Sequence, residues 1–484
     1  MTSIKDSRKW IRQIERVVGQ ENCLSSPAEL FIYATDGLPL DPQEPSLVVL
    51  PGCTEEVAEV VRICRSVGKS FVPRGAGTGL SGGAHPLNND VVISCMRMAQ
   101  VLEIDEINRF AVVQPGVVNA DLSRAVEHLG LFYAPDPSSQ QACTVGGNVA
   151  ENSGGPHTLK YGTTTNHVLS LELVLPDGSV SRLGSASGFS PGYDLVGAFV
   201  GSEGTLGIVT EMTVRLTEIP EATETALVIF DDVPSACRLV GRIIQAGMVP
   251  AALEVVDQRT VAAVEASVYA AGLPLDAGAV LITELDGAEC ELPDQLDRIR
   301  ELAIEEGARE VSVARDAEER AFFWRARKGA FGAMGRLAPD LYVHDAVVPR
   351  AHLPEVLEGI CEIGDRYSLK LSNVFHAGDG NLHPNISFDR RDEDELARVL
   401  AAGREMLELC LKVGGVLTGE HGVGIEKRDY MGLLFSDKDL DAMMKLRDAF
   451  NPEGLCNPGK LIPTTRACME ANPKAHGYDA VPIR

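Results

Sequence analysis

Two histidines that flank a turn are the residues of this sequence best placed to do chemistry together. His376 and His383 lie on either side of Asp379-Gly380, and an Asp-Gly dipeptide is a strong signal for a two-residue β-hairpin turn. If these two residues form the turn, His376 and His383 are directly opposed on neighbouring strands, with Cβ atoms about 4.5–5.5 Å apart. Two imidazoles at that spacing can chelate one metal ion. Asn385 would share their face of the hairpin and is a candidate catalytic residue.

A carboxylate and a third imidazole follow in a glycine-rich segment. Glu420 and His421 stand between Gly419 and Gly422, and two histidines with one carboxylate are a common ligand set for a divalent metal that keeps positions open for substrate. A single histidine is more often an ordinary hydrogen-bonded or surface residue, but the combined pattern HxGDGNLH and GEHG favours a site. A metallohydrolase with the same ligands is a rival interpretation, which leaves the other glycine-rich segments unexplained.

Glycine is concentrated in a few short segments of the chain. Clustered glycines allow the backbone to approach a ligand closely. Of the 47 glycines, nineteen fall within residues 75–83, 146–155, 201–207, 378–380 and 414–424.

The first of these segments contains two familiar motifs that its flanks contradict. Its glycines satisfy both GxGxxG, typical of NAD-binding Rossmann folds, and GxSxG, typical of serine hydrolases. Both motifs require a helix directly after the loop, whereas residues 84–90 (AHPLNND) cannot begin one. We therefore reject both functions and interpret the segment as an anion-binding loop beside Arg74; the alternative is a surface loop without a ligand. Together with the loops at 146–155 and 201–207, it suggests a long ligand whose phosphates and rings run under several loops.

Three sequence segments carry a resemblance to a known family. PRGAGTGLSGGA, TVGGNVAENSGG and FVGSEGTLGIVTEMTVRL, in this order, resemble the PCMH-type FAD-binding domain of the vanillyl-alcohol-oxidase flavoproteins. The resemblance extends over roughly residues 40–465 and is strongest with the D-2-hydroxy-acid branch, which includes the FAD subunit of glycolate oxidase and FAD-linked D-lactate dehydrogenase. It implies non-covalent FAD, because Thr78 occupies the position where relatives with covalent flavin carry a histidine.

The resemblance also implies which residues contact the cofactor. Residues 74–79 would hold the pyrophosphate, and residues 135–155 and 201–209 would contact the flavin and adenosine. The candidate FAD-binding residues are Arg74, Gly75, Ala76, Gly77, Thr78, Gly79, Pro135, Asp136, Thr144, Gly146, Gly147, Asn148, Asn152, Gly154, Tyr161, Gly162, Glu203, Gly204, Ile208, Val209 and Asn457.

The family further implies roles for the reactive residues. His376, His383 and Glu420 would bind one divalent metal (Zn, Mn or Fe), and His421 would be the catalytic base. The family places a carboxylate-binding arginine at the position of Arg327, within the basic run FFWRARK; the alternative for this run is a solvated helix face. A bidentate arginine is well suited to holding a carboxylate.

These implications lead to a hypothesis for function. We expect an FAD-dependent dehydrogenase that oxidises a short D-2-hydroxy acid, D-lactate or glycolate, to the 2-oxo acid by hydride transfer to flavin N5. D-2-hydroxyglutarate dehydrogenase is an alternative, disfavoured because Val343 occupies the position of a lysine that those enzymes carry. A non-catalytic flavin-binding subunit of an electron-transfer complex is another, although it would not need the histidine motifs.

The electrons must then pass to a separate acceptor. None of the eleven cysteines has CxxC spacing, so this chain alone cannot hold a ferredoxin-type cluster. The expected acceptor is an iron–sulfur subunit, an electron-transfer flavoprotein, a cytochrome or a quinone.

The elements that position these residues indicate an α+β protein of two main domains. A strand–helix–strand pattern over 46–73 and short strands over 91–220 predict a two-part FAD-binding domain, residues 1–219 with an N-terminal helix. Alternating strands and helices from 226 to 306 predict an α+β substrate (cap) domain, residues 220–414. Residues 415–484 are expected to form a helical segment that returns to the FAD domain.

The overall composition limits the possible partners. The 484 residues carry a net charge of −25, which argues against nucleic-acid binding because that requires a basic surface. The N-terminus is charged, and the sequence has no apolar run of 18 residues. We therefore expect no signal peptide and no membrane span. We expect a cytoplasmic protein; homodimer formation and peripheral membrane association through a partner are left open.

Overall fold

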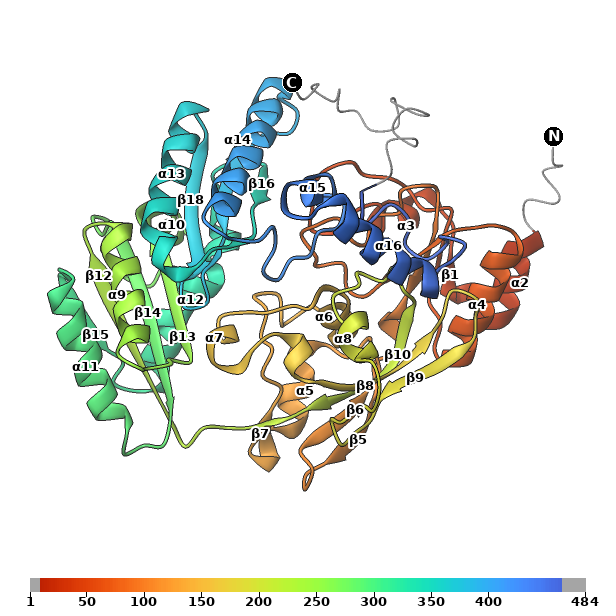
Figure 1. The fold of residues 1–484 in the computed structure, drawn as a ribbon, viewed down its shortest axis with the longest axis horizontal. Coiled ribbons are helices and arrows are strands. Elements are labelled where there is room, and N and C mark those ends of the chain that lie inside the picture. The colour runs from red at the N-terminus through yellow and green to blue at the C-terminus, as the bar shows by residue number, and fades with distance from the viewer. Residues whose placement is uncertain (1–8, 464–484) are drawn as a thin grey trace.

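The computed structural model describes residues 9–463 as two lobes (Figure 1). The first lobe holds the N-terminal half, and the second holds the strands and helices from β12 to β20. The chain then returns across the first lobe in helices α15 and α16. The predicted N-terminal helix is present as α2 (Lys9–Val18). Residues 1–8 and 464–484, which belong to the predicted terminal segments, lie outside the described residues.

The first lobe corresponds to the predicted FAD-binding domain and is called the FAD lobe below. Its first part is a small α/β layer, as the strand–helix–strand pattern predicts. Three strands run parallel and are buried on both faces, as is usual for parallel strands covered by helices. Helix α4 (Thr54–Ser66) packs against them. The sheet order is β1 (Cys23–Leu24), β2 (Leu47–Val49), β4 (Val91–Ser94) and β3 (Phe71–Arg74).

The second part of this lobe is an antiparallel sheet with its own core. Helix α5 (Asn119–Val126) covers it, and helix α6 (Val145–Glu151) begins within the second glycine segment. The sequence pattern predicted neither helix, because only short β-rich runs stood out there. The sheet order is β5 (Val101–Asp105), β6 (Phe110–Val113), β10 (Ile208–Arg215), β8 (Val168–Val174) and β9 (Val180–Gly184).

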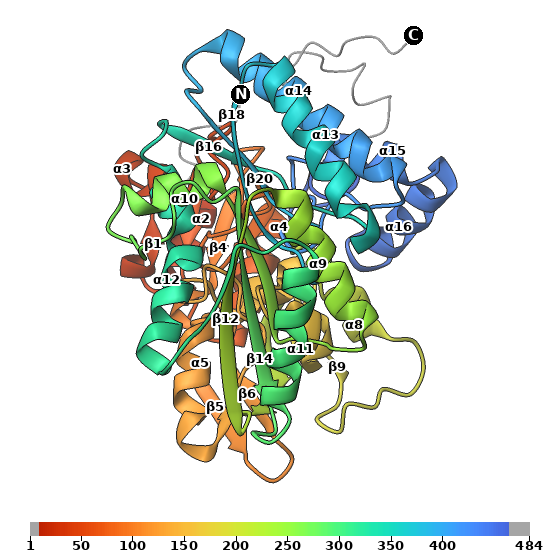
Figure 2. The same cartoon turned by 90° about the vertical axis from the view of Figure 1, so that its left-hand side faces the viewer.

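The second lobe is built on one large sheet with helices on both faces. Alternate residues of its long central strands enter two separate cores, as the period-two geometry of a strand requires. Figure 2 shows α9 and α11 on one side and α10 and α12 on the other. Its strands are β12 (Ala222–Phe230), β13 (Ala252–Asp257), β14 (Ala279–Gly287), β15 (Glu310–Val313), β16 (Asp340–Val343), β17 (Ala346–Val347), β18 (Lys370–His376), β19 (Asn381–Leu382) and β20 (Pro384–Phe388).

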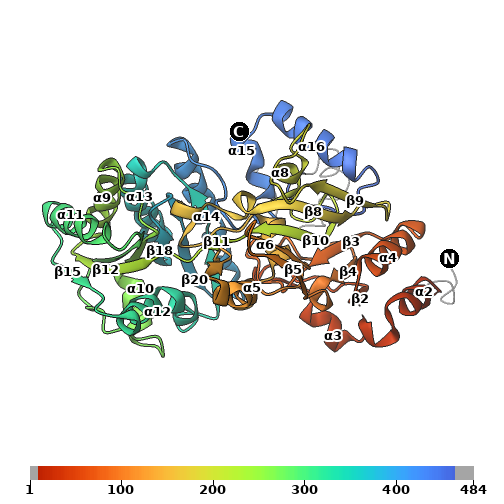
Figure 3. The ribbon, with the colours of Figure 1, turned by 90° about the horizontal axis from the view of Figure 1, so that it is seen from below.

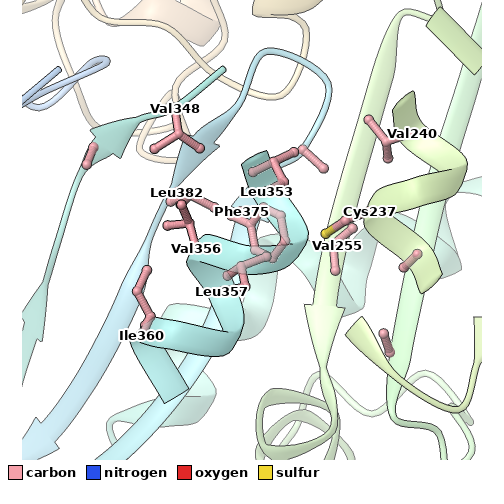
Figure 4. Close-up of a cluster of buried hydrophobic side chains, with 14 of the residues drawn as sticks. Cys237, Val240, Val255, Val348, Leu353, Val356, Leu357, Ile360, Phe375 and Leu382 are labelled. Atoms are coloured by element: carbon pink, nitrogen blue, oxygen red, sulfur yellow. The ribbon is translucent and has the colours of Figure 1, made fainter. Parts of the chain in front are cut away.

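The helices of this lobe fix the strands that carry the histidines. In Figure 4, apolar side chains of α9 and α13 pack around Phe375, the residue before His376. The chain then continues through α14 before the glycine-rich loop. The helices are α9 (Val233–Gln245), α10 (Gln258–Glu265), α11 (Leu292–Glu305), α12 (Ala317–Met334), α13 (Leu353–Arg366) and α14 (Glu393–Lys412).

The C-terminal part of the chain packs on the FAD lobe. Helices α15 (Met431–Leu434) and α16 (Asp437–Phe450) lie over it beside α8 (Leu195–Phe199) (Figure 3). Phe71 N donates to Leu455 O at 2.9 Å, and Asn457 N donates to Phe71 O at 2.8 Å. Among residues 9–463, no helix is both long and apolar enough to cross a bilayer.

A partly buried histidine, His157, joins the two lobes. His157 Nδ1 lies 2.7 Å from Asp136 Oδ2 of the FAD lobe, and Nε2 lies 3.0 Å from Glu284 Oε1 of the second lobe. Glu284 also accepts hydrogen bonds from Trp324 Nε1 (2.6 Å) and Thr225 Oγ1 (2.8 Å). Burial alone would lower the pKa of His157, but the two carboxylates raise it well above its usual value. The imidazolium therefore donates to both carboxylates and ties the lobes together.

We expect His157→Gln to reduce the free energy of unfolding by about 1–3 kcal/mol at pH 6. Since the folded-state pKa is raised, the contribution of the charged ring is fully present below about pH 6.5 and is lost as pH rises through the folded pKa. The difference between wild type and variant should therefore shrink in alkaline solution, as measured by urea unfolding across pH 6–10.

The matched control is His352→Gln, because His352 also pairs with a carboxylate, Glu355, but on the surface. That change should alter stability little at any pH. A His157→Gln effect that stays the same size at alkaline pH would contradict the charged bridge.

Candidate functional site

A cavity of about 400 Å³ joins the glycine loops to the histidine cluster. Its walls include all three glycine segments of the FAD lobe, and His383, Glu420 and His421 complete it from the opposite side. Two segments that are some 300 positions apart in sequence thus face one another across a single space. The predicted FAD residues on the lining are Arg74, Gly75, Ala76, Gly77, Thr78, Gly79, Thr144, Gly146, Gly147, Asn148, Glu203, Gly204, Ile208 and Val209.

Arg74 gives the first glycine loop a fixed positive charge. It ends β3, is only 8% exposed, and its Nη1 atom has no hydrogen-bond partner among the described residues. The loop wraps the guanidinium so closely that a Cβ at Gly77 would lie 2.2 Å from Arg74 Nη2. No helix follows at residues 84–90, which confirms the rejection of both motifs. The guanidinium also lies over the Tyr33 ring, 5.3 Å from its centroid. A buried cation with a free Nη1 beside open backbone is the chemistry that an anion requires.

Seven other predicted FAD residues do not line the cavity but form the structure behind it. Asp136 binds His157, and the Tyr161 hydroxyl donates to Asp286 Oδ2. Asn457 donates to the carbonyl oxygens of Gly83 (2.9 Å) and Glu203 (2.6 Å). The polar side chains among the seven hold loops rather than face the cavity. The seven are Pro135, Asp136, Asn152, Gly154, Tyr161, Gly162 and Asn457.

Three of the predicted metal-ligating atoms converge. His376 Nε2 lies 3.2 Å from Glu420 Oε1, and His383 Nε2 lies 3.1 Å from the same oxygen. The other ring nitrogens are held from behind: His376 Nδ1 is 2.7 Å from Glu254 Oε1, and His383 Nδ1 is 3.2 Å from the His344 carbonyl oxygen. Outer partners of this kind are typical of metal-binding histidines, because they fix the tautomer and the ring orientation.

The predicted register of the histidine hairpin is wrong by two residues. His376 pairs with Asn381, not with His383, and the turn spans four residues, 377–380. The wider turn is anchored because Val348 N donates to Gly380 O (3.0 Å) and Arg350 Nη1 donates to Gly378 O (3.1 Å). A shift of two residues keeps every side chain on its face. The two rings therefore still meet, with centroids 5.1 Å apart.

The segment that carries Glu420 and His421 is held by the carboxylate of Asp345. Asp345 accepts hydrogen bonds from the Thr418 hydroxyl and from the backbone N–H groups of Gly419 (3.0 Å), Glu420 (3.2 Å) and His421 (2.9 Å). Asp345 is fully buried. Burial would raise its pKa, but neighbouring positive groups hold it below the usual value. The carboxylate is thus ionised and organises the loop.

Glu203 holds the same loop from the FAD lobe. Its two carboxylate oxygens accept from Val423 N (2.6 Å) and Gly424 N (2.7 Å). Gly424 has φ +52, and a Cβ there would lie 2.1 Å from Ser81 O. The loop can therefore dock against the first glycine segment only with glycine at this position.

His421 faces the cavity as a neutral base. Its ring stacks on that of His383 with centroids 4.8 Å apart and an interplanar angle of 9°. Burial lowers its pKa to about 4, although Asp345 acts in the opposite direction. An unprotonated imidazole at neutral pH can accept a proton.

Arg327 and Asn385 do not lie on the cavity lining. Arg327 is 1% exposed, and its Nε donates to Glu254 at 2.6 Å; a buried guanidinium needs a carboxylate partner, and Glu254 provides it. Asn385 is fully buried and donates to the His383 carbonyl oxygen at 2.6 Å. The cation that α12 presents to the cavity is Lys328, which differs from the expectation for Arg327.

Sequence reasoning missed Glu254, Asp345 and His157. Glu254 and Asp345 stand in the apolar runs AALEVVD and LYVHDAVV. A carboxylate within a buried strand is costly unless it has a specific partner. That pattern was an available signal for both residues, whereas nothing local distinguishes His157.

The sequence matches two families of flavoproteins in adjacent parts. Residues 45–184 match "FAD binding domain", and residues 219–461 match "FAD linked oxidases, C-terminal domain". Glycolate oxidase subunit GlcD of Escherichia coli strain K12 is 45% identical over 94% of this chain and 91% of its own length. D-lactate dehydrogenase of Anaerostipes hadrus is 33% identical over 86% of this chain and 89% of its own.

A solved structure supports the fold. p-Cresol methylhydroxylase, determined with substrate bound, superposes with a TM-score of 0.82 and covers 95% of this chain and 97% of its own, at 18% identity. At that identity the similarity shows a shared fold and nothing finer. The predicted PCMH-type α+β architecture is confirmed.

We expect Asp345→Asn to destabilise the protein by about 2–4 kcal/mol, because one oxygen that accepts several N–H groups is replaced by a donor. Urea unfolding measures this directly. Asp365→Asn is the control, since Asp365 is an exposed aspartate on α13, and it should change stability little. Equal stability of Asp345→Asn and wild type would show that the carboxylate does not organise the loop.

Proposed function

We infer that this chain, which belongs to the FAD-linked oxidases, is a dehydrogenase that oxidises a short D-2-hydroxy acid, D-lactate or glycolate, to the 2-oxo acid. The observation that carries the proposal is the single cavity that brings the glycine loops and the Glu420–His421 segment together. The names of the relatives, glycolate oxidase subunit and D-lactate dehydrogenase, support the same substrate class.

Non-covalent FAD is the cofactor that the cavity suits. The unpartnered Arg74 fits the pyrophosphate, and the glycine segments leave room for rings along the cavity. FAD, when bound, supplies the two-electron redox chemistry. The protein provides orientation and electrostatics around the reacting groups.

One divalent metal, Zn, Mn or Fe, is proposed at His376, His383 and Glu420. The donor set fits, because both Nε2 atoms point at one carboxylate oxygen while their outer nitrogens are held. Asp345, His383 and His421 are also close enough to form a metal-ligand set. The Asp345 carboxylate, however, already accepts hydrogen bonds from the backbone N–H groups of the loop. A metal here would supply a positive charge for the substrate carboxylate and 2-hydroxyl.

His421 is proposed as the base that takes the hydroxyl proton. Its Nε2 lies 3.8 Å from Glu420 Oε1 and is therefore close to the metal ligands. Lys328 adds positive charge to the cavity on the α12 side. We assign Arg327 a positioning role, since Arg327 holds Glu254 and Glu254 holds His376. Asn385 similarly supports the backbone of His383.

The electron acceptor is proposed to be a separate molecule. The ten described cysteines are all free and most are buried, so within residues 9–463 they form no cluster site. The word "subunit" in the name of the Escherichia coli relative supports a protein complex. We also propose a cytoplasmic location, which agrees with the finding that no helix within residues 9–463 could cross a membrane.

We expect D-lactate or glycolate to bleach the flavin absorbance of the holoprotein near ~450 nm under anaerobic conditions. D-2-Hydroxyglutarate and the L-enantiomer of lactate are run in parallel. His421→Asn should slow bleaching by roughly 100-fold or more while leaving the oxidised spectrum intact, because a general base contributes about 10²–10⁴-fold.

His128→Asn is the control, since His128 is an exposed histidine of the FAD lobe. Wild-type bleaching rates in His421→Asn would refute its role as the base. No bleaching by any 2-hydroxy acid would refute the proposed activity and favour a non-catalytic flavin subunit.

We also expect about one divalent metal per chain and a loss of it in His383→Ala, since removal of one ligand of three leaves too few donors. Elemental analysis of the purified protein measures the metal, and the flavin spectrum reports that FAD is retained. His352→Ala, remote from the cluster on the surface, should keep the metal. Full metal content in His383→Ala, or bleaching that is insensitive to a chelator, would exclude the metal from this site.

A further inference from the structure

A second cavity of about 510 Å³ lies directly behind the first. It lies between the α8 segment of the FAD lobe and the returning helices α15 and α16, which Figure 3 shows side by side, and it opens to the surface. Its lining is mainly apolar and flexible, a character suited to a hydrophobic ligand. Representative lining residues are Val200, Leu206, Met431, Leu434, Phe435 and Met443.

The two cavities share a wall that is one residue thick. Glu151, Ser202, Glu203 and Glu420 line both of them. A molecule in the second cavity would thus be separated from the FAD cavity by a single layer of side chains. This places it next to the redox centre of the proposed function without competing with the 2-hydroxy acid for space.

The shared wall contains polar atoms that lack a partner. Ser202 is 5% exposed, and neither its hydroxyl nor the buried Oε2 atom of Glu151 has a hydrogen-bond partner within residues 9–463. Burial, together with the nearby Glu203, raises the pKa of Glu151, so this carboxyl can act as a donor. Buried polar groups normally have partners. These two are suited to a ligand that presents carbonyl oxygens from an otherwise apolar body.

The rim of the cavity is apolar as well. Val416 and Leu446 belong to the lining and are 40% and 42% exposed. A lipophilic molecule can therefore pass from the surface into the cavity along side chains of its own polarity. The one arginine of the lining, Arg447, is already paired with Asp448.

We propose that this second cavity binds a quinone, which is the electron acceptor of the protein. The inference rests on the proposed function, and the redox stoichiometry fits it. Oxidation of one 2-hydroxy acid to the 2-oxo acid releases two electrons and two protons. Reduction of one quinone consumes the same number, with one proton added to each carbonyl oxygen to give the quinol. The wall carboxyls Glu151 and Glu203 lie where those protons must cross.

The test fills the cavity by Leu434→Trp. Leu433→Trp is the matched control, because Leu433 precedes it on α15, is 43% exposed and does not line the cavity. The holoprotein is photolabelled with an azidoquinone, with decylubiquinone as competitor, and labelled peptides are identified by mass spectrometry. Reoxidation of the substrate-reduced protein by decylubiquinone is followed in the same samples, with ferricyanide as the polar acceptor.

We expect the label within residues 416–447 of wild type and Leu433→Trp, displaced by decylubiquinone. In Leu434→Trp, labelling and quinone-dependent reoxidation should fall by about tenfold or more, since the added ring occupies the site. Met443→Trp, on α16, is the second variant and should behave in the same way. Reoxidation by ferricyanide should differ little between the two Leu→Trp variants.

Two results would overturn the inference. One is labelling elsewhere or not displaced by decylubiquinone, and the other is equal quinone reactivity in Leu434→Trp and Leu433→Trp. Reoxidation by ferricyanide but not by quinone would also refute it and point to a protein acceptor. The proposed function fails separately, through absence of flavin bleaching by 2-hydroxy acids, whereas site-specific labelling does not depend on that reaction.

Discussion

The site depends on the clamping of one short loop, residues 418–424, between two buried carboxylates. Asp345 of the second lobe accepts the N–H groups at the start of the loop, and Glu203 of the FAD lobe accepts those at its end. The buried charge of Asp345 is tolerated because several N–H donors satisfy it, whereas burial raises the pKa of Glu203 and two N–H donors act in the opposite direction. Glu420 and His421 occupy the middle of this loop, so their position relative to the FAD cavity is fixed from both lobes.

The same constraint explains how an acidic protein can accommodate anionic ligands. The net charge of −25 is spread over the surface, where salt screens it over about 8–10 Å. The local field in the cavity is set by nearby groups instead. Arg74 and Lys328 line it, and Lys427, fully buried behind the loop, pairs with Glu426. At short range in a low-dielectric interior, Arg74 and Lys328 act more strongly than distant surface carboxylates. The carboxyl groups of Asp36, Glu151, Glu203 and Glu420 line the same cavity, so the positive charge is local to the Arg74 loop and to Lys328.

Sequence patterns predicted the elements and the cluster well, and the reasons for the errors are physical. The hairpin register was wrong by two residues, but the faces were right because strand periodicity is two. On α12, the charge run FFWRARK could not show which cation would face the cavity, since that depends on how the helix is rotated against the sheet. Arg327 donates a hydrogen bond to Glu254, and the next residue, Lys328, lines the cavity. Contacts between lobes, such as His157 with Glu284, leave no local pattern.

Glu203 connects these features to electron transfer. Its carboxylate fixes the catalytic loop through Val423 and Gly424, and its side chain also forms part of the wall between the two cavities. Because these hydrogen bonds hold the loop against the FAD lobe, Glu420 also becomes part of the wall between the two cavities. The close approach that positions the substrate-binding groups therefore also makes the barrier behind the FAD cavity thin. A thin wall with an apolar space behind it is a direct consequence of placing Glu420 and His421, the proposed metal ligand and base, on a segment that returns from the other lobe.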